Sequence, residues 1–225
     1  MPINIAIDGP SGAGKSTIAR AASKRLGFIY VDTGALYRAV ACHMLSRGIS
    51  ADDEEAVSAE LAGLGEDYFS LRFIDGVQHV FCGEEDVSDK IRTPEISMGA
   101  SNVSAIPAVR KYLFELQRKI ARENNIIMDG RDIGTVVLPN ADLKIYLTAS
   151  AEERANRRFK ELSAKKDCPP YDKVLADIRQ RDYNDMNREI APLKQADDAV
   201  LADTSELNFE EATELVLRLI REKIG

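Results

Sequence analysis

The stretch from Ile3 to Thr17 limits the folds open to this chain more than any other part of the sequence. Its β-branched start, Ile3 to Ile7, is typical of a short buried parallel strand. The spacing G-x-x-x-x-G-K-[ST] follows in residues 9–16, and a helical pattern begins at once. Glycines let such a loop wrap until its backbone N–H groups converge on phosphate oxygens, while the helix dipole favours the same anion. The stretch therefore predicts a nucleoside-triphosphate site.

We call residues 9–17 the glycine-rich loop. In this motif the lysine, here Lys15, lies against the β- and γ-phosphates, and the hydroxyl of Ser16 faces Mg²⁺. The residues expected to hold the triphosphate are Gly9, Pro10, Ser11, Gly12, Ala13, Gly14, Lys15, Ser16 and Thr17.

Length and charge limit the alternatives. A chain of 225 residues with 44% apolar content fits one α/β domain with an insertion, or two small domains. Its formal charge of −7 argues against a broad nucleic-acid-binding face, because such faces are basic overall. Positive charge for binding phosphate must therefore be concentrated locally.

The cysteines, histidines and hydropathy point away from other classes. Three widely separated cysteines predict reduced thiols, and neither His43 nor His79 has the neighbours of a catalytic triad or a metal site. The sequence shows no signal-peptide pattern and no apolar run approaching 18 residues. We expect a cytoplasmic protein that contacts neither membrane nor nucleic acid.

Five apolar segments alternate with helical patterns, which predicts a parallel sheet covered on both sides. They are residues 3–7, 28–31, 126–128, 143–147 and 200–202. Residues 66–90 have a different texture, because apolar residues alternate on either side of Asp75-Gly76. That pattern is typical of an antiparallel hairpin, so we interpret these residues as an inserted β module.

Charged residues gather at three further places. Arg38 is expected in the first turn of a helix, where a cation opposes the dipole and often meets an external anion, although a solvated surface arginine is the simpler reading. Asp129-Gly-Arg-Asp132 crowds three charges at the end of a buried strand, where open α/β sheets bind ligands.

The third place is residues 150–189. Ser150 and Glu153 form an apparent capping box, and the basic residues Arg154, Arg157, Arg158, Lys160, Lys165 and Lys166 follow. A helical stripe then passes from apolar residues into Arg181, Asp185 and Arg188. Charges on an inward face need partners, and phosphates suit arginines. We interpret the segment as a lid.

The chain resembles the bacterial cytidylate kinases of the nucleoside-monophosphate (NMP) kinase family, within the P-loop NTPase superfamily. The resemblance covers residues 3–223. Beyond the first motif it rests on four further stretches: Asp32-Thr-Gly-Ala-Leu-Tyr-Arg38; Asp129-Gly-Arg-Asp-Ile-Gly-Thr135; Arg181-Asp182 through Asp185 and Arg188; and Ala191-Pro-Leu193. It implies an α/β fold with a five-stranded parallel sheet flanked by helices, an antiparallel β module in the NMP-binding region and a short helical lid.

The resemblance also implies a single kinase domain with three parts. These are a core of residues 1–65, 106–150 and 190–225, an NMP-binding insertion of residues 66–105 and a lid of residues 151–189. The implied reaction moves the γ-phosphoryl group of ATP to CMP or dCMP, in pyrimidine nucleotide metabolism, and the implied assembly is a monomer. Thr33 stands where many relatives have serine, which keeps the hydroxyl.

The family's site residues transfer to matching positions. The residues that the resemblance assigns to substrate binding are Thr33, Arg38, Ser101, Arg110, Arg131, Asp132, Arg181, Asp185 and Arg188. The catalytic residues are Lys15, Arg131, Arg181 and Arg188, and Arg157 and Arg158 of the lid join the ATP site. Ser16 ligates Mg²⁺, with Asp129 through water as an open possibility. Ser101, Arg110 and Asp132 are assigned to cytosine, which suits its N4 donor and its N3 and O2 acceptors.

Two other readings compete with this one. A related kinase would act on UMP, AMP or a non-nucleotide acceptor, but the β module and the Arg110–Asp132 combination argue against it. A nucleotide-dependent switch would carry a guanine-reading N-K-x-D motif, which the sequence lacks.

Overall fold

A computed structural model of the protein describes residues 1–163 and 168–225. Beyond its first two residues, the chain forms two compact units. The first, which we call the loop unit, comprises residues 3–30 and 125–225, and the second, the hairpin unit, comprises residues 31–124. We describe each by itself.

A five-stranded parallel sheet has the strand order β2-β6-β1-β7-β8. The strands are β1 (Asn4–Asp8), β2 (Ile29–Asp32), β6 (Ile126–Gly130), β7 (Leu143–Thr148) and β8 (Val200–Asp203). The central position of β1 explains its β-branched composition, because both of its faces are covered and nearly all of its residues are buried. The predicted parallel sheet is confirmed.

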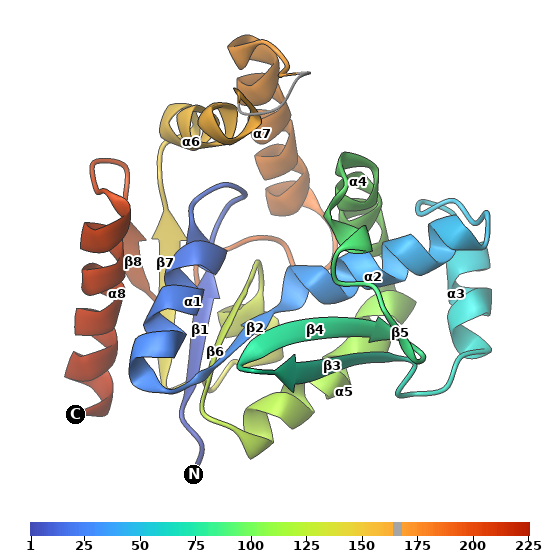
Figure 1. Ribbon diagram of the computed structural model, residues 1–225, viewed down its shortest axis with the longest axis horizontal. Coiled ribbons are helices and arrows are strands. Elements are labelled where there is room, and N and C mark those ends of the chain that lie inside the picture. Colours follow the sequence, from blue (N-terminus) through green and yellow to red (C-terminus); the bar gives the residue numbers. More distant parts are fainter. Residues whose placement is uncertain (164–167) are drawn as a thin grey trace. The chain divides into compact units, whose positions relative to one another are not determined.

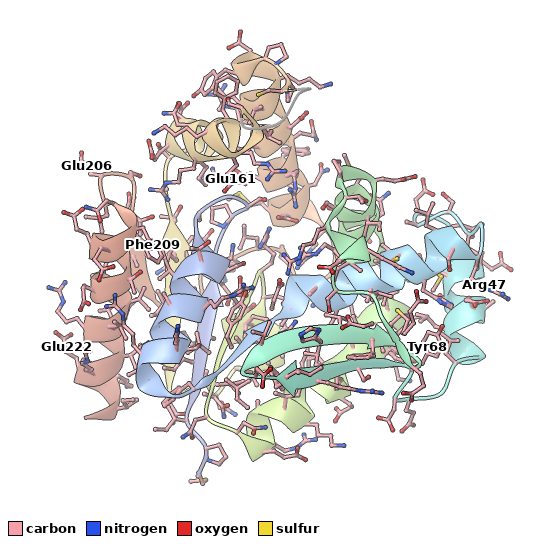
Figure 2. The ribbon with its side chains drawn as sticks, viewed as in Figure 1. Arg47, Tyr68, Glu161, Glu206, Phe209 and Glu222 are labelled. Atoms are coloured by element: carbon pink, nitrogen blue, oxygen red, sulfur yellow. The ribbon has the colours of Figure 1, made fainter. Side chains whose placement is uncertain are left out.

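The helices of the loop unit are α1 (Lys15–Leu26), α6 (Ala151–Ser163), α7 (Tyr171–Asn187) and α8 (Phe209–Ile224), with one π-helical turn, η2 (Ile133–Val137). Helices α1 and α8 share an apolar core with the sheet, and α6 packs on α7 around Ala155 and Ile178. Figure 1 shows α6 just beyond the carboxyl end of β7. Figure 2 places Phe209 and Glu222 near the two ends of α8. The lid region thus follows directly from a sheet strand.

The hairpin unit contains α2 (Thr33–Ser46), α3 (Glu54–Ala62), β3 (Phe69–Ile74), β4 (Val77–Cys82), β5 (Glu85–Asp86), η1 (Lys90–Arg92), α4 (Pro94–Val103) and α5 (Pro107–Glu123). Strands β3, β4 and β5 form an antiparallel sheet, shown in green in Figure 1. Its β3–β4 turn has Asp75 at φ 51° and Gly76 at φ 74°, the two positive values that a tight hairpin requires. The predicted β module is confirmed.

Several local expectations need correction. Arg38 lies in the second turn of α2, because the helix begins at Thr33 and its cap is Asp32. Ser150 accepts a hydrogen bond from the Glu153 N–H at 3.2 Å, but the Glu153 carboxylate pairs with Arg157. Helix α8 does have a full capping box, formed by its N-cap residue Asn208 and by Glu211 in its first turn.

Two further expectations concern the lid and membrane contact. Lys165 and Lys166 of the expected lid lie outside the described residues. Within the described part of the chain, no helix is long and apolar enough to cross a membrane.

Candidate functional site

The glycine-rich loop follows β1 and leads into α1. A Cβ on Gly9 would lie 1.9 Å from the carbonyl oxygen of Leu147, so only glycine fits beside β7 there. Gly12 and Gly14 have φ values of 76° and 89°, which ordinary side chains rarely adopt. The first turn of α1 carries no acidic residue, so its dipole is not offset there. These constraints produce a helix start that is suited to an anion.

Lys15 lies at the centre of this loop. Its ammonium group donates to the Pro10 carbonyl oxygen at 2.8 Å, and the residue is only 5% exposed. Burial, and then the positive charge of Arg131, lower the pKa of Lys15 to about 7, although nearby carboxylates oppose the shift. A bound polyphosphate would favour the charged form, so this lysine is suited to an anionic ligand.

Asp129, at the end of β6, is held by two hydroxyl groups. Ser16 Oγ donates to one carboxylate oxygen and the Tyr30 hydroxyl to the other, each at 2.9 Å. Mg²⁺ prefers oxygen ligands and keeps several waters, so the hydroxyl and carboxylate fit the expected ion. The sequence did not point to Tyr30, whose only signal is a polar tip within an apolar strand.

Changing Tyr30 to Phe is expected to raise the Mg²⁺ concentration that supports half-maximal turnover several-fold, because one hydrogen bond that orients Asp129 is lost, worth about 1 kcal/mol. The measurement is a Mg²⁺ titration of turnover, paired with calorimetry of ATP binding with and without Mg²⁺. Tyr171→Phe, which removes a hydroxyl from an exposed contact with Glu152, is the matched control. An unchanged Mg²⁺ midpoint in both assays would contradict this role of Tyr30.

Two arginine–carboxylate pairs join β6 and its following turn to the end of α7. Arg131 Nε donates to Asp185 at 2.7 Å, and Arg188 Nη2 donates to Asp132 at 3.3 Å. Arg188 Nε also donates to the carbonyl oxygen of Ala191, a residue held at φ 49°. This strained turn explains the position of the Ala191-Pro-Leu193 motif, because it aims a carbonyl at the guanidinium. The structure brings these four predicted charged residues together in two pairs.

The remaining lid arginines differ in their surroundings. Arg157 reaches the Thr204 carbonyl oxygen at 2.7 Å and that of Ala13 in the loop at 3.4 Å. Arg158 is half exposed and pairs with Glu161. Arg181 is partly buried on α7, one turn before Asp185. Of the two lid arginines assigned to the triphosphate, Arg157 is the one that contacts the loop.

Arg154, which the sequence placed only in a general positive cluster, is a buried clamp. Its guanidinium donates to both carboxylate oxygens of Asp182 at 3.0 and 2.7 Å, and to the Ser11 carbonyl oxygen at 3.0 Å. It thereby ties α6 to α7 and to the glycine-rich loop. Sequence spacing gives little signal of such a long-range contact.

Asp8 ends β1 and supports the turn that follows Asp132. Its two carboxylate oxygens accept from the N–H groups of Ile133 at 2.8 Å and Gly134 at 2.7 Å. Burial raises the pKa of Asp8 to about 6 against these hydrogen bonds. A Cβ on Gly134 would lie 3.0 Å from Lys144 Cδ, so the glycine permits the close approach.

The Asp8 carboxyl predicts a specific pH dependence of stability. Its folded pKa of about 6 exceeds the reference value of 3.8, so between these pH values the folded protein binds more protons than the unfolded chain. Its contribution to the free energy of unfolding therefore falls as pH rises through that window. Relative to Asp8→Asn, the natural protein should gain roughly 2 kcal/mol between pH 7 and pH 4. Urea unfolding of both proteins measures this, and a difference independent of pH would contradict it.

The hairpin unit carries the other predicted residues. Asp32 caps α2 by accepting from the Ala35 N–H, and it pairs with Arg38 Nη2; both distances are 2.9 Å. Arg38 Nε is buried and, among the described residues, has no hydrogen-bond partner. Thr33, the first residue of α2, is also buried. The start of α2 thus presents a cation whose hydrogen bonding is incomplete.

Arg110, which the resemblance assigns to cytosine, is buried on α5. It donates to the Ser104 carbonyl oxygen at 3.3 Å and lies over the Tyr37 ring. Ser104 in turn donates to the carbonyl oxygen of Ser101 at 2.8 Å. The structure therefore links Ser101 and Arg110 through Ser104.

Sequence comparisons with known proteins point to one family. A family model described as "Cytidylate kinase" matches residues 5–222. The cytidylate kinase of Caldicellulosiruptor bescii is 51% identical over 96% of this chain and 95% of its own. That of Carboxydothermus hydrogenoformans is 48% identical over 98% of each. Among solved structures, shikimate kinase from Bacteroides thetaiotaomicron has the same fold at 12% identity, with a TM-score of 0.50 and coverage of 97% of this chain and 98% of the other.

Proposed function

This chain belongs to the cytidylate kinase family, and we propose that it transfers the γ-phosphoryl group of ATP to CMP or dCMP, giving ADP and CDP or dCDP. The observation that carries the proposal is the buried Lys15, which follows a loop that requires glycine at positions 9, 12 and 14 and lies close to the paired Arg131 and Asp185. Cationic groups around a glycine-rich helix start are what phosphoryl transfer requires.

The donor is ATP, whose phosphates bind along the glycine-rich loop. Backbone N–H groups of the loop and the start of α1 hold the β- and γ-phosphates, and Lys15 neutralises their charge. Arg157, already bonded to the loop at Ala13, approaches from α6. Ser16 would hold Mg²⁺, with Asp129 acting through water, and the ion would supply positive charge to the phosphates.

The acceptor nucleotide is assigned to residues carried over from the family resemblance. Its phosphate is bound by arginines, each of which offers a planar set of donors for phosphate oxygens. Its cytosine is read by Ser101, Arg110 and Asp132, and its sugar by Asp185. Arg181 stabilises the phosphoryl group in transit. The arginines assigned to the acceptor phosphate are Arg38, Arg131 and Arg188.

No general base is needed, because the attacking group is already a phosphate oxygen. The bond from the γ-phosphorus to the bridging oxygen of ADP breaks as the bond to the CMP phosphate oxygen forms. The protein contributes orientation of the two phosphates, positive charge from Lys15 and the arginines, and exclusion of water by the lid. Arg131 and Arg188 are paired with Asp185 and Asp132, which balances the charge of these partly buried guanidinium groups.

The proposal is tested by measuring ADP release from Mg·ATP with CMP, dCMP, UMP, AMP, GMP or no acceptor. We expect turnover to be concentrated on CMP and dCMP. Turnover on another nucleotide would retain the kinase and discard the cytosine assignment. Hydrolysis without an acceptor, or none at all, would contradict the transfer reaction.

A further inference from the structure

Gln78, in β4 of the inserted hairpin, makes an unusual contact with the end of β2. Its side-chain oxygen accepts from the Asp32 N–H at 2.8 Å, and its side-chain nitrogen donates to the Asp32 carbonyl oxygen at 3.2 Å. One amide side chain thus satisfies both backbone groups of a single residue, as a neighbouring strand would. Both residues belong to the hairpin unit, so the contact lies within one compact body.

Asp32, the residue held in this way, makes further contacts through its side chain. The Asp32 carboxylate accepts from the Ala35 N–H and from Arg38, and the residue is 9% exposed. Holding the Asp32 backbone in place sets the direction of its carboxylate, and the carboxylate in turn orients the guanidinium group of Arg38. The fit is close, since a Cβ on Gly34 would lie 3.2 Å from the Asp32 carboxylate and 3.4 Å from Arg38.

The hairpin is anchored independently of Gln78. Phe69 and Val80 are buried in the apolar core that α2 shares with β3 and β4. The neighbouring His79 is directed to the hairpin itself, where it contacts Asp86 at 2.7 Å. Removing the Gln78 amide should therefore leave the hairpin folded while freeing the Asp32 backbone.

We propose that Gln78 is a positioning residue for the acceptor nucleotide, acting through the Asp32 backbone and carboxylate on Arg38. The inference rests on the proposed function, in which Arg38 binds the CMP phosphate. The antiparallel module then contributes to the reaction, because it holds the start of α2 in the orientation that presents Arg38 to the nucleotide.

The test compares Gln78→Met, which has similar length and neither hydrogen bond, with Gln78→Glu, which keeps an acceptor for the Asp32 N–H but repels the carbonyl oxygen. We expect the KM and the dissociation constant for CMP to rise about tenfold in Gln78→Met, while kcat and the KM for ATP stay within about twofold. His79→Gln, a change at the next residue of the same strand, is the control and should leave all three constants unchanged. Equal losses for CMP and ATP, or an unchanged CMP constant in both Gln78 variants, would overturn the proposal.

A double-mutant cycle separates this inference from the assignment of Arg38. If Gln78 acts through Arg38, then Gln78→Met should have little further effect on CMP binding in an Arg38→Ala background. Additive effects would overturn the positioning role while leaving Arg38 in the acceptor site. An Arg38→Ala variant with unchanged CMP binding would remove the assignment of Arg38 and, with it, the inference.

Discussion

Replacing Lys15 with Met is expected to lower kcat by about 10²–10³-fold while leaving the protein folded. The loss follows from removing a preorganised positive group from phosphates whose charge is redistributed in the transition state. The fold should survive because Met has similar length and does not bear the cost of a buried ammonium group. Steady-state turnover with saturating Mg·ATP and CMP measures the effect, and circular dichroism checks the fold.

Lys24→Met is the matched control, because Lys24 is exposed on the same helix, α1. It makes the same chemical change outside the loop and should retain normal turnover. A Lys15→Met enzyme that works at a near-normal rate would remove Lys15 from the donor site.

Replacing Asp132 with Asn is expected to lower kcat/KM for CMP by about 10²-fold or more, with the KM for ATP nearly unchanged. The buried carboxylate pairs with Arg188, and we assign it to the cytosine amino group, which needs an acceptor. Asparagine can place a donor there instead, which mispairs with cytosine and suits the carbonyl group of uracil. The preference for CMP over UMP should therefore fall as well.

The measurement is a set of kinetic constants for CMP, UMP and ATP with the natural protein and Asp132→Asn. Asp177→Asn, at an exposed position of α7, gives the same change of charge away from the pairs. Equal effects on CMP and ATP would place Asp132 outside the acceptor site.

The architecture could be predicted because its signals are local. Alternation of apolar residues around Asp75-Gly76 predicted the β3–β4 hairpin, and β-branched runs such as Ile5 and Ile7 predicted strands buried on both faces. Gly27 is the left-handed C-cap of α1, and a glycine directly after a helical pattern is a common signal of a helix end. Each of these features depends on a few consecutive residues, so one sequence is enough to read them.

Long-range polar contacts could not be predicted in the same way. Arg110 was assigned to cytosine through the family resemblance alone, and its local sequence did not indicate that it is buried against Ser104 and Tyr37. Arg154 looked like one member of a charged cluster, although Asp182 and a loop carbonyl satisfy it. Tyr37, Asp182 and Ser11 lie far along the chain from the arginines that they contact, so helical periodicity does not indicate these partners.

The most direct test of the account is a crystal structure of the protein with CMP bound. We predict that the cytosine edge contacts Arg110 and Asp132, and that the phosphate contacts Arg38 together with Arg131 or Arg188. A nucleotide whose base lies away from Arg110 and Asp132, or whose phosphate has none of these arginines as a partner, would contradict the assignment of the acceptor site.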